Sequence, residues 1–195
     1  MHPLHSHRHM ALAAVAAAAI GLLVACSTES EPPTAAVQQA DAHAAHARAN
    51  NGDLSPAQKQ AITRVRNTTT RFHELAAAQA AGYTEQYPAG CAVSPDGEGA
   101  QAFHYLNPGL VDANVELLRP ELLMYEPGPN GQRQLIGVDY IVPLELSATP
   151  PTLLGVPFMR NEPLGVWALH IWAWRPNPSG MFAAWNPKVS CEHAP

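Results

Sequence analysis

Residues 121–142 read ELLMYEPGPNGQRQLIGVDYIV, and this stretch decides the fold class. Two runs rich in apolar, β-branched and aromatic residues, 121–126 and 132–142, flank the segment PGPNG at 127–131. Proline and glycine in that segment favour a turn, whereas the flanking runs are typical of strands. The pattern therefore predicts two antiparallel strands joined as a hairpin.

A helix is predicted before the strands. Ser55-Pro56-Ala57-Gln58 provides an N-cap, a proline suited to the first turn and a glutamine that completes a capping box. Apolar residues at helical spacing continue to Tyr83, and Gly82 is a natural C-terminal stop. The run Asn67-Thr68-Thr69-Thr70 disfavours helix and is expected to bend it or divide it in two.

Runs at 101–107 and 166–175 predict two further strands. The order of elements indicates an α+β fold, with one long N-terminal helix packed on a curved antiparallel sheet or partial β-barrel. A length of 195 residues allows one such domain, which we place at 56–195. The chain has 11 Lys+Arg against 16 Asp+Glu, a net charge of −5, which argues against a nucleic-acid partner.

The N-terminus has the form of an export signal. Residues 10–25 are an unbroken apolar stretch, too short for a comfortable membrane span of about 20 residues. Leu23-Val24-Ala25-Cys26 resembles the lipobox of bacterial lipoproteins. The resemblance implies a signal peptide over 1–25, removed before Cys26, and acylation of Cys26 with diacylglycerol and a chain such as palmitate. The alternatives are an ordinary signal peptide and an uncleaved anchor helix.

Residues 26–55 would then form a lipidated cysteine and a disordered tether, because their composition offers too little apolar surface to bury. Export places Cys91 and Cys191 in an oxidising compartment, where a disulfide bond is the default for a single remaining pair. Their alternative role as metal ligands lacks a CxxC spacing.

Each of three predicted strands carries one titratable residue on an apolar face. Alternation along each strand puts His104 on one face with Ala102 and Leu106, Asp139 with Leu135 and Ile141, and His170 with Trp172 and Trp174. We expect His104, Asp139 and His170 to converge as a two-histidine, one-carboxylate site for a divalent metal ion. The alternative is a self-satisfied polar group in the core, or three residues that are not neighbours.

Further candidate ligand-binding residues lie beside these three. They are Tyr105, Asn107, Tyr140 and Trp172, with Glu121 as another residue near the site. All four tryptophans (Trp167, Trp172, Trp174 and Trp185) lie near the C-terminus. They would form either an aromatic wall for a ligand or the core of a terminal strand.

Several motifs together carry a resemblance to a known group of proteins. They are His104-Tyr105-x-Asn107-Pro108, Gly137-Val138-Asp139-Tyr140, Leu169-His170-Ile171-Trp172-x-Trp174, Asn177-Pro178-Ser179-Gly180-Met181-Phe182 and Asn186-Pro187-x-Val189-Ser190-Cys191. The combination resembles an uncharacterised family of exported bacterial proteins. The resemblance implies export and no particular activity.

These features predict a membrane-anchored envelope lipoprotein, held in the cell membrane or the outer membrane by lipid on Cys26, that binds a small ligand or a divalent metal ion. One alternative is a metal-dependent enzyme that uses His104, Asp139 and His170, and another is a structural or protein-interaction lipoprotein without a ligand. The sequence contains no GxSxG, HExxH, GxGxxG or P-loop motif, so it identifies no catalytic residue and leans away from an enzyme.

Overall fold

The structure is a computed structural model that describes residues 53–195. The predicted signal peptide, Cys26 and all but the last residues of the predicted tether lie outside the described residues. Within 53–195, no helix is both long enough and apolar enough to cross a membrane.

The helical part begins where the sequence predicts and is interrupted. Helix α2, Pro56–Thr69, opens with the predicted capping box, in which the Ser55 hydroxyl accepts from the Gln58 backbone N–H and the Gln58 side chain accepts from the Ser55 backbone N–H. A 3₁₀ turn, η1 (Thr70–His73), and a short helix, α3 (Leu75–Ala80), follow. The prediction of one long helix is therefore wrong, whereas the expected interruption near residues 67–70 is confirmed, since α2 ends at Thr69. The backbone then leaves the helical region at Glu74, with a φ of −85° and a ψ of 111°.

Seven strands form one antiparallel sheet. Six of them follow the order β1-β3-β4-β5-β9-β8, and the seventh, β2, pairs with β3. The strands of this sheet are β1 (Glu85–Gln86), β2 (Ala92–Val93), β3 (Ala100–Leu106), β4 (Leu122–Pro127), β5 (Arg133–Pro143), β8 (Met159–Asn161) and β9 (Val166–Ile171). The predicted α+β fold with an antiparallel sheet is therefore confirmed. Since β1 and β8 do not pair with each other, the sheet is not closed, and the alternative of a partial barrel is wrong.

Four short elements complete the described chain. They are the 3₁₀ turns η2 (Pro108–Leu110) and η3 (Leu144–Leu146), and a small separate hairpin of β6 (Thr152–Leu153) and β7 (Val156–Pro157).

The predicted hairpin is present as β4 and β5, but β5 contains a bulge. Met124 pairs with Gly137, whereas the next residue of β4, Tyr125, pairs with Leu135. The extra residue, Ile136, interrupts the alternation, so Leu135 lies in the cluster that faces the helices and not on the face of Asp139. The prediction that Leu135 and Asp139 share a face is therefore wrong.

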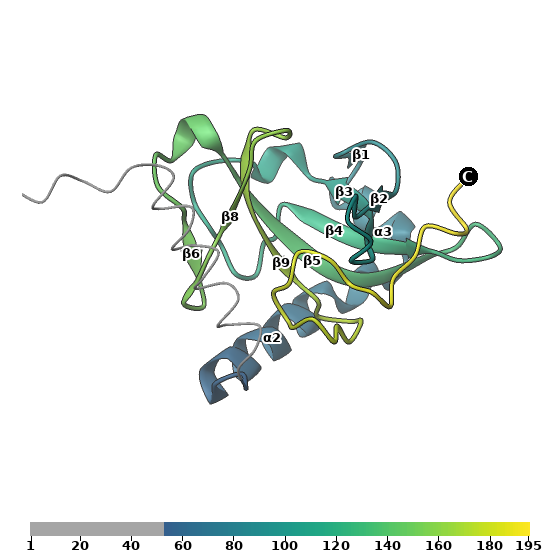
Figure 1. Ribbon diagram of the computed structural model, residues 1–195, viewed down its shortest axis with the longest axis horizontal. Coiled ribbons are helices and arrows are strands. Elements are labelled where there is room, and N and C mark those ends of the chain that lie inside the picture. Colours follow the sequence, from purple (N-terminus) through teal and green to yellow (C-terminus); the bar gives the residue numbers. More distant parts are fainter. Residues whose placement is uncertain (1–52) are drawn as a thin grey trace, which may run out of the picture. The chain divides into compact units, whose positions relative to one another are not determined.

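The two faces of the sheet are covered differently. Helices α2 and α3 lie along one face (Figure 1), where Ile62, Val65 and Phe72 pack with side chains of β3, β4, β5 and β9 in the main core. We call the opposite face the outer face. It holds two smaller apolar clusters, one around Met124 and Trp172 and the other around Leu122 and Ile141.

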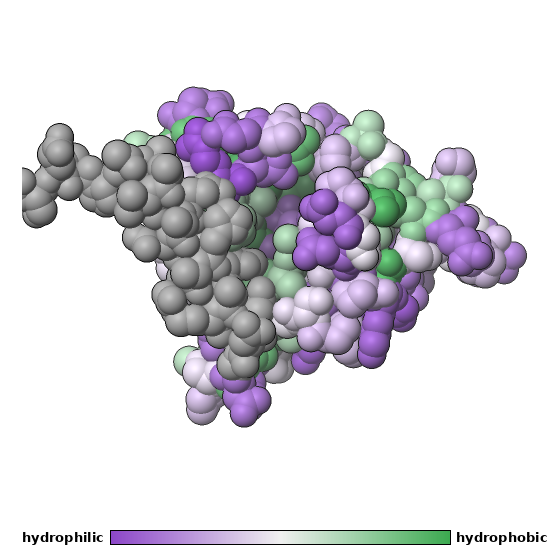
Figure 2. Space-filling model, in the orientation of Figure 1, coloured by the Kyte–Doolittle hydropathy of each residue, from purple (hydrophilic) through white to green (hydrophobic). Residues whose placement is uncertain are grey.

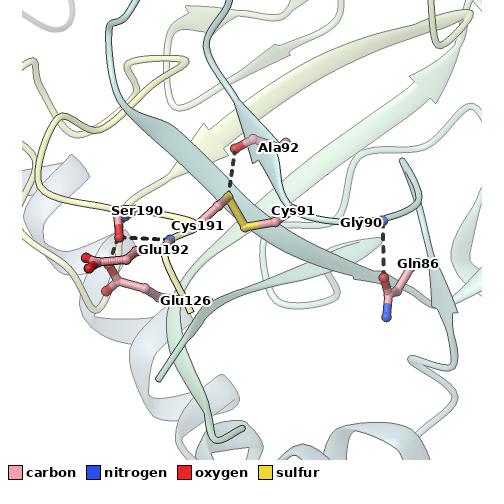
Figure 3. The surroundings of a disulfide bond; sticks show 8 residues. All are labelled: Gln86, Gly90, Cys91, Ala92, Glu126, Ser190, Cys191 and Glu192. Carbon is pink, nitrogen blue, oxygen red and sulfur yellow. Dashed lines mark hydrogen bonds between the residues drawn. A yellow bond between two sulfur atoms is a disulfide. The ribbon is translucent and has the colours of Figure 1, made fainter. Parts of the chain in front are cut away.

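The predicted disulfide joins the C-terminal segment to the sheet. The Sγ atoms of Cys91 and Cys191 are bonded, and their Cα atoms lie 5.9 Å apart (Figure 3). The Ser190 backbone N–H also donates to Oε1 of Glu126, at 3.1 Å. Asn186 forms a backbone bridge with Ala100, so the segment after β9 returns to the start of β3 and is held there.

Candidate metal centre

His104, Asp139 and His170 come together on the outer face, as the sequence predicts. They belong to β3, β5 and β9, and Asp139 and His170 are direct partners across the β5–β9 ladder. His104 lies on the far side of β4 from Asp139, and its ring reaches across that strand.

Local sequence explains why these three side chains are held in an apolar setting. Two positions before and after each of them, the chain carries an aliphatic residue, a tryptophan or a glycine. These residues are Ala102 and Leu106, Gly137 and Ile141, and Ala168 and Trp172. The exposed fractions of His104, Asp139 and His170 are accordingly only 2%, 5% and 8%. The group lies between the two apolar clusters of the outer face.

The three side chains are close but do not hydrogen-bond one another. Nε2 of His104 lies 3.9 Å from Oδ2 of Asp139, and Nε2 of His170 lies 3.6 Å from the same oxygen. Both distances exceed the 2.7–3.2 Å that is usual for an N–H···O bond. Nδ1 of His104, Oδ1 of Asp139 and Nε2 of His170 are buried without a hydrogen-bond partner among the described residues. Such orphaned groups are costly and require an explanation.

A small cavity lies between the side chains. Its volume is about 20 Å³, and His104, Asp139 and His170 all line it, together with Leu122 and Ile141. A space of roughly 10–15 Å³ suffices for one water molecule. The cavity therefore has room for a single water or ion, and not for an organic ligand.

Burial controls the protonation of all three groups. Loss of solvent lowers the pKa of His104 from 6.5 to about 4, and Asp139 partly opposes this shift. Burial likewise lowers the pKa of His170 to about 4. It raises the pKa of Asp139 from 3.8 to about 6, against the attraction of His104. At neutral pH, two neutral imidazoles thus face one buried carboxylate, and neither imidazole neutralises its charge.

This is the donor set and protonation state that a transition-metal ion requires. Neutral imidazoles and a carboxylate bind Zn²⁺ at about 2.0–2.2 Å, and two histidines with one carboxylate also hold iron in many enzymes. The three ligand atoms lie within 4.8 Å of one another. Tetrahedral bonds of that length separate ligand atoms by about 3.3 Å, so binding requires side-chain movements of the order of 1 Å. Such a site leaves at least one coordination position open.

The other candidate ligand-binding residues lie mostly elsewhere. Tyr105 and Tyr140 are in the core that faces the helices, and the Tyr140 hydroxyl donates to the backbone carbonyl of Leu117, at 2.6 Å. The Asn107 side chain donates to the carbonyl of Ala81, at 3.0 Å, and accepts from the backbone N–H of Gly109, at 3.1 Å. The structure therefore does not bring Tyr105, Asn107 or Tyr140 into contact with the three-residue cluster.

Glu121 is also buried and does not line the cavity, although the charge of Asp139 contributes to its raised pKa. Its Oε2 accepts from the backbone N–H of Ile141, at 3.2 Å, and burial raises its pKa from 4.5 to about 8. The neighbouring charge of Glu121 contributes to the raised pKa values of Tyr83 and Tyr140, which places it near these helix-side tyrosines.

The tryptophans do not form one wall. Trp172 stacks beside His170, with ring centroids 6.3 Å apart and an angle of 19° between the planes. Its Nε1 donates to the backbone carbonyl of Ala183, at 2.7 Å. Trp174 instead packs against the main core and contacts His73. The prediction that it shares a face with His170 is wrong, because β9 ends at Ile171 and the alternation ends with it.

Sequence reasoning missed Gln101 and Asn161, which line the cavity with the cluster. Simple alternation assigns Gln101 to the face of Phe103. The backbone of Ala102 adopts a φ of +65°, and the pairing of β2 with β3 shifts between Ala92 and Val93, so the alternation is interrupted there. Asn161 ends the three-residue strand β8, which carries no clear pattern in the sequence.

Comparisons with known proteins do not assign the chain to a family. No protein-family model matches the chain, and no curated protein or solved structure matches it.

Proposed function

We propose that the domain binds one divalent metal ion through His104, Asp139 and His170. The observation that carries the proposal is that His104, Asp139 and His170 line one cavity of about 20 Å³ and offer ligand atoms within 4.8 Å of one another. Each of the three also has a buried side-chain atom without a hydrogen-bond partner among the described residues. An ion in this cavity would supply a partner to each side chain at once.

The charge of the site favours an ion over a water molecule. A water can donate to Asp139 and to an unprotonated histidine nitrogen, which would satisfy hydrogen bonds. It carries no charge to balance a carboxylate that is 5% exposed and lies beside two neutral histidines. The backbone of Tyr140 and Leu169 stabilises that carboxylate only in part, since burial still raises its pKa to about 6. A buried charge without compensation costs several kcal/mol, and a divalent cation removes that cost.

The ligand types indicate which metal the site would hold. Two imidazoles and one carboxylate suit Zn²⁺, Fe²⁺ or a similar transition metal, whereas Ca²⁺ and Mg²⁺ prefer oxygen ligands alone.

Backbone strain supports a functional role for this region. Ala102, two residues before His104, holds a positive φ of 65° that costs a non-glycine residue about 1–2 kcal/mol.

We also propose that this domain is exported and anchored by lipid on Cys26 in the cell membrane or outer membrane of the bacterial envelope. The lipobox-like residues 23–26 support this proposal. The disulfide between Cys91 and Cys191 accords with it, since disulfides persist in oxidising compartments.

The metal proposal is tested by titrating the chelator-treated full chain with Zn²⁺ in a competition assay. The wild-type chain should bind one ion, and His104→Ala and His170→Ala should each weaken binding by more than about 100-fold. His193→Ala is the matched control, because His193 is an exposed histidine outside the cluster. Equal affinity in the wild type, the two cluster variants and the control would reject the site.

A further inference from the structure

A larger hollow adjoins the proposed metal centre on its outer side. It has a volume of about 240 Å³ and is lined by residues that include Arg160, Trp185 and Met159. Four residues, Gln101, Asn161, Ala168 and His170, line both this hollow and the 20 Å³ cavity. The two spaces are therefore neighbours, and His170 lies in the wall of each. Figure 2 shows that the surface of the molecule is hollowed near the middle of the view and that polar and apolar residues border it.

The hollow has a definite chemical character. Arg160, from β8, is the one charged residue among those that line it, and Gln101 and Asn161 contribute side-chain amides. Nε2 of Gln101 donates to the carbonyl of Ala184, and Oδ1 of Asn161 accepts from the backbone N–H of Leu164, so both amides are held in place. The half-buried indole of Trp185 supplies an aromatic surface.

Two neighbours hold the Arg160 side chain in place, and the one that carries a negative charge is exposed to solvent. Its guanidinium lies 5.4 Å from the centre of the Trp167 ring and forms an ion pair with Glu162. The Glu162 side chain is 67% exposed, so solvent screens this pair. A divalent ion held by one carboxylate and two neutral imidazoles would carry a net charge of about +1. The inner end of the hollow would then be positive, and the Arg160 guanidinium, paired with Glu162, would present a cation to the outer end.

We propose that the hollow binds a small organic carboxylate, whose carboxylate group occupies an open position of the metal ion beside His170 while its body lies between Arg160 and Trp185. This inference rests on the proposed metal site. The hollow is smaller than the 300–1,000 Å³ of usual drug-sized pockets, which limits the ligand to about the size of one ring. A planar aromatic acid can bind the ion through its carboxylate while its ring contacts the Arg160 guanidinium and the Trp185 indole.

The test uses Co²⁺ as the metal and benzoate as the probe, with the full chain. Binding of Co²⁺ alone is measured first, from its visible absorption. Benzoate is then added, and we expect a saturable change in the Co²⁺ spectrum. Arg160→Gln removes the cation that faces the benzoate ring, and should weaken benzoate binding about tenfold and leave Co²⁺ affinity unchanged. The matched control is Arg64→Gln, because Arg64 is exposed on α2 and does not line the hollow.

The outcomes separate the two proposals. Normal Co²⁺ binding with no spectral response to benzoate would overturn the carboxylate site and leave the metal site standing. A response that Arg160→Gln and Arg64→Gln weaken equally would overturn the placement of the ligand in this hollow. Failure of the wild-type chain to bind Co²⁺ would overturn the metal site, and the inference that rests on it.

Discussion

Replacement of Asp139 by asparagine is expected to stabilise the metal-free protein near neutral pH. The folded chain raises the pKa of this carboxyl from 3.8 to about 6, chiefly through burial. A shift of about two pKa units corresponds to roughly 3 kcal/mol of unfavourable free energy when the group is ionised in the folded state. Asparagine has nearly the same shape and no charge. Because its amide still leaves a buried polar group imperfectly paired, we expect a net gain of about 1–2 kcal/mol.

The sign of the pH dependence follows from the direction of this shift. Between about pH 4 and pH 6, the folded state holds the Asp139 proton more tightly than the unfolded state does. Stability contributed by the protonated carboxyl is therefore present below about pH 4 and is lost as pH rises to 6. Asp139→Asn should accordingly match the wild type near pH 4 and exceed it above pH 6.

Urea unfolding with excess chelator, at a series of pH values, measures this difference in the free energy of unfolding. Asp96→Asn is the matched control, because Asp96 is exposed and lies outside the cluster. In the presence of Zn²⁺ the order should reverse, since only the wild type gains binding energy. If Asp139→Asn instead destabilised the metal-free protein at pH 7.5, the carboxylate would be a satisfied part of the core, and the reasoning would be refuted.

Three further predictions concern the disulfide, the histidines and the bulge. Serine at both Cys91 and Cys191 should lower the free energy of unfolding by up to about 4.7 kcal/mol, the chain-entropy value for a loop of 100 residues; an unchanged urea midpoint would contradict this. Burial lowers the pKa of His104 and His170 to about 4, so between pH 6.5 and 4 the unfolded chain binds their protons more tightly than the folded chain does. Compared with a His104→Gln, His170→Gln double variant, the metal-free wild type should therefore lose stability as pH falls from 6.5 to 4. Parallel pH profiles of the two proteins would count against this prediction. Gly137→Ala would place a Cβ atom 2.6 Å from the carbonyl oxygen of Ile171 in β9, and should lower the free energy of unfolding by about 1–3 kcal/mol. Thermal unfolding measures this effect, and an unchanged melting temperature would contradict it.

Much of the sheet was predictable because its strands follow simple alternation. The turn between β4 and β5 was predictable from proline and glycine at 127–131. Alternation in the sequence also indicated that His104, Asp139 and His170 each lie on an apolar face of a strand, and pairing across β5 and β9 then brings Asp139 and His170 together. Cys91 and Cys191 were predictable as a pair by elimination.

The errors arose where the backbone departs from a regular period. The bulge at Ile136 reverses the side of Leu135, and the end of β9 at Ile171 releases Trp174 from the alternation. The bulge and the end of β9 both depend on contacts between strands that are distant in sequence, so no local sequence pattern predicts them. The position of Tyr105, by contrast, could have been inferred, because it is adjacent to His104 in a strand and must face the other way.

The hollow beside the cluster was not predictable. Arg160 and Asn161 lie in β8, a strand of three residues whose pairing with β9 depends on the path of the preceding loop. Trp185 comes from the segment that returns across the outer face, where its position follows from the bridge between Ala100 and Asn186. These residues approach His170 only through tertiary structure.

The most direct test of the central claim is X-ray absorption spectroscopy on the full chain loaded with one equivalent of Zn²⁺. The proposed ligand set predicts one bound ion with two imidazole nitrogens and at least one carboxylate oxygen at about 2.0–2.2 Å, and loss of the imidazole signal in the His104→Ala, His170→Ala double variant. A zinc ion that keeps only water-like oxygen ligands in the wild type, or an imidazole signal that survives in the double variant, would contradict it.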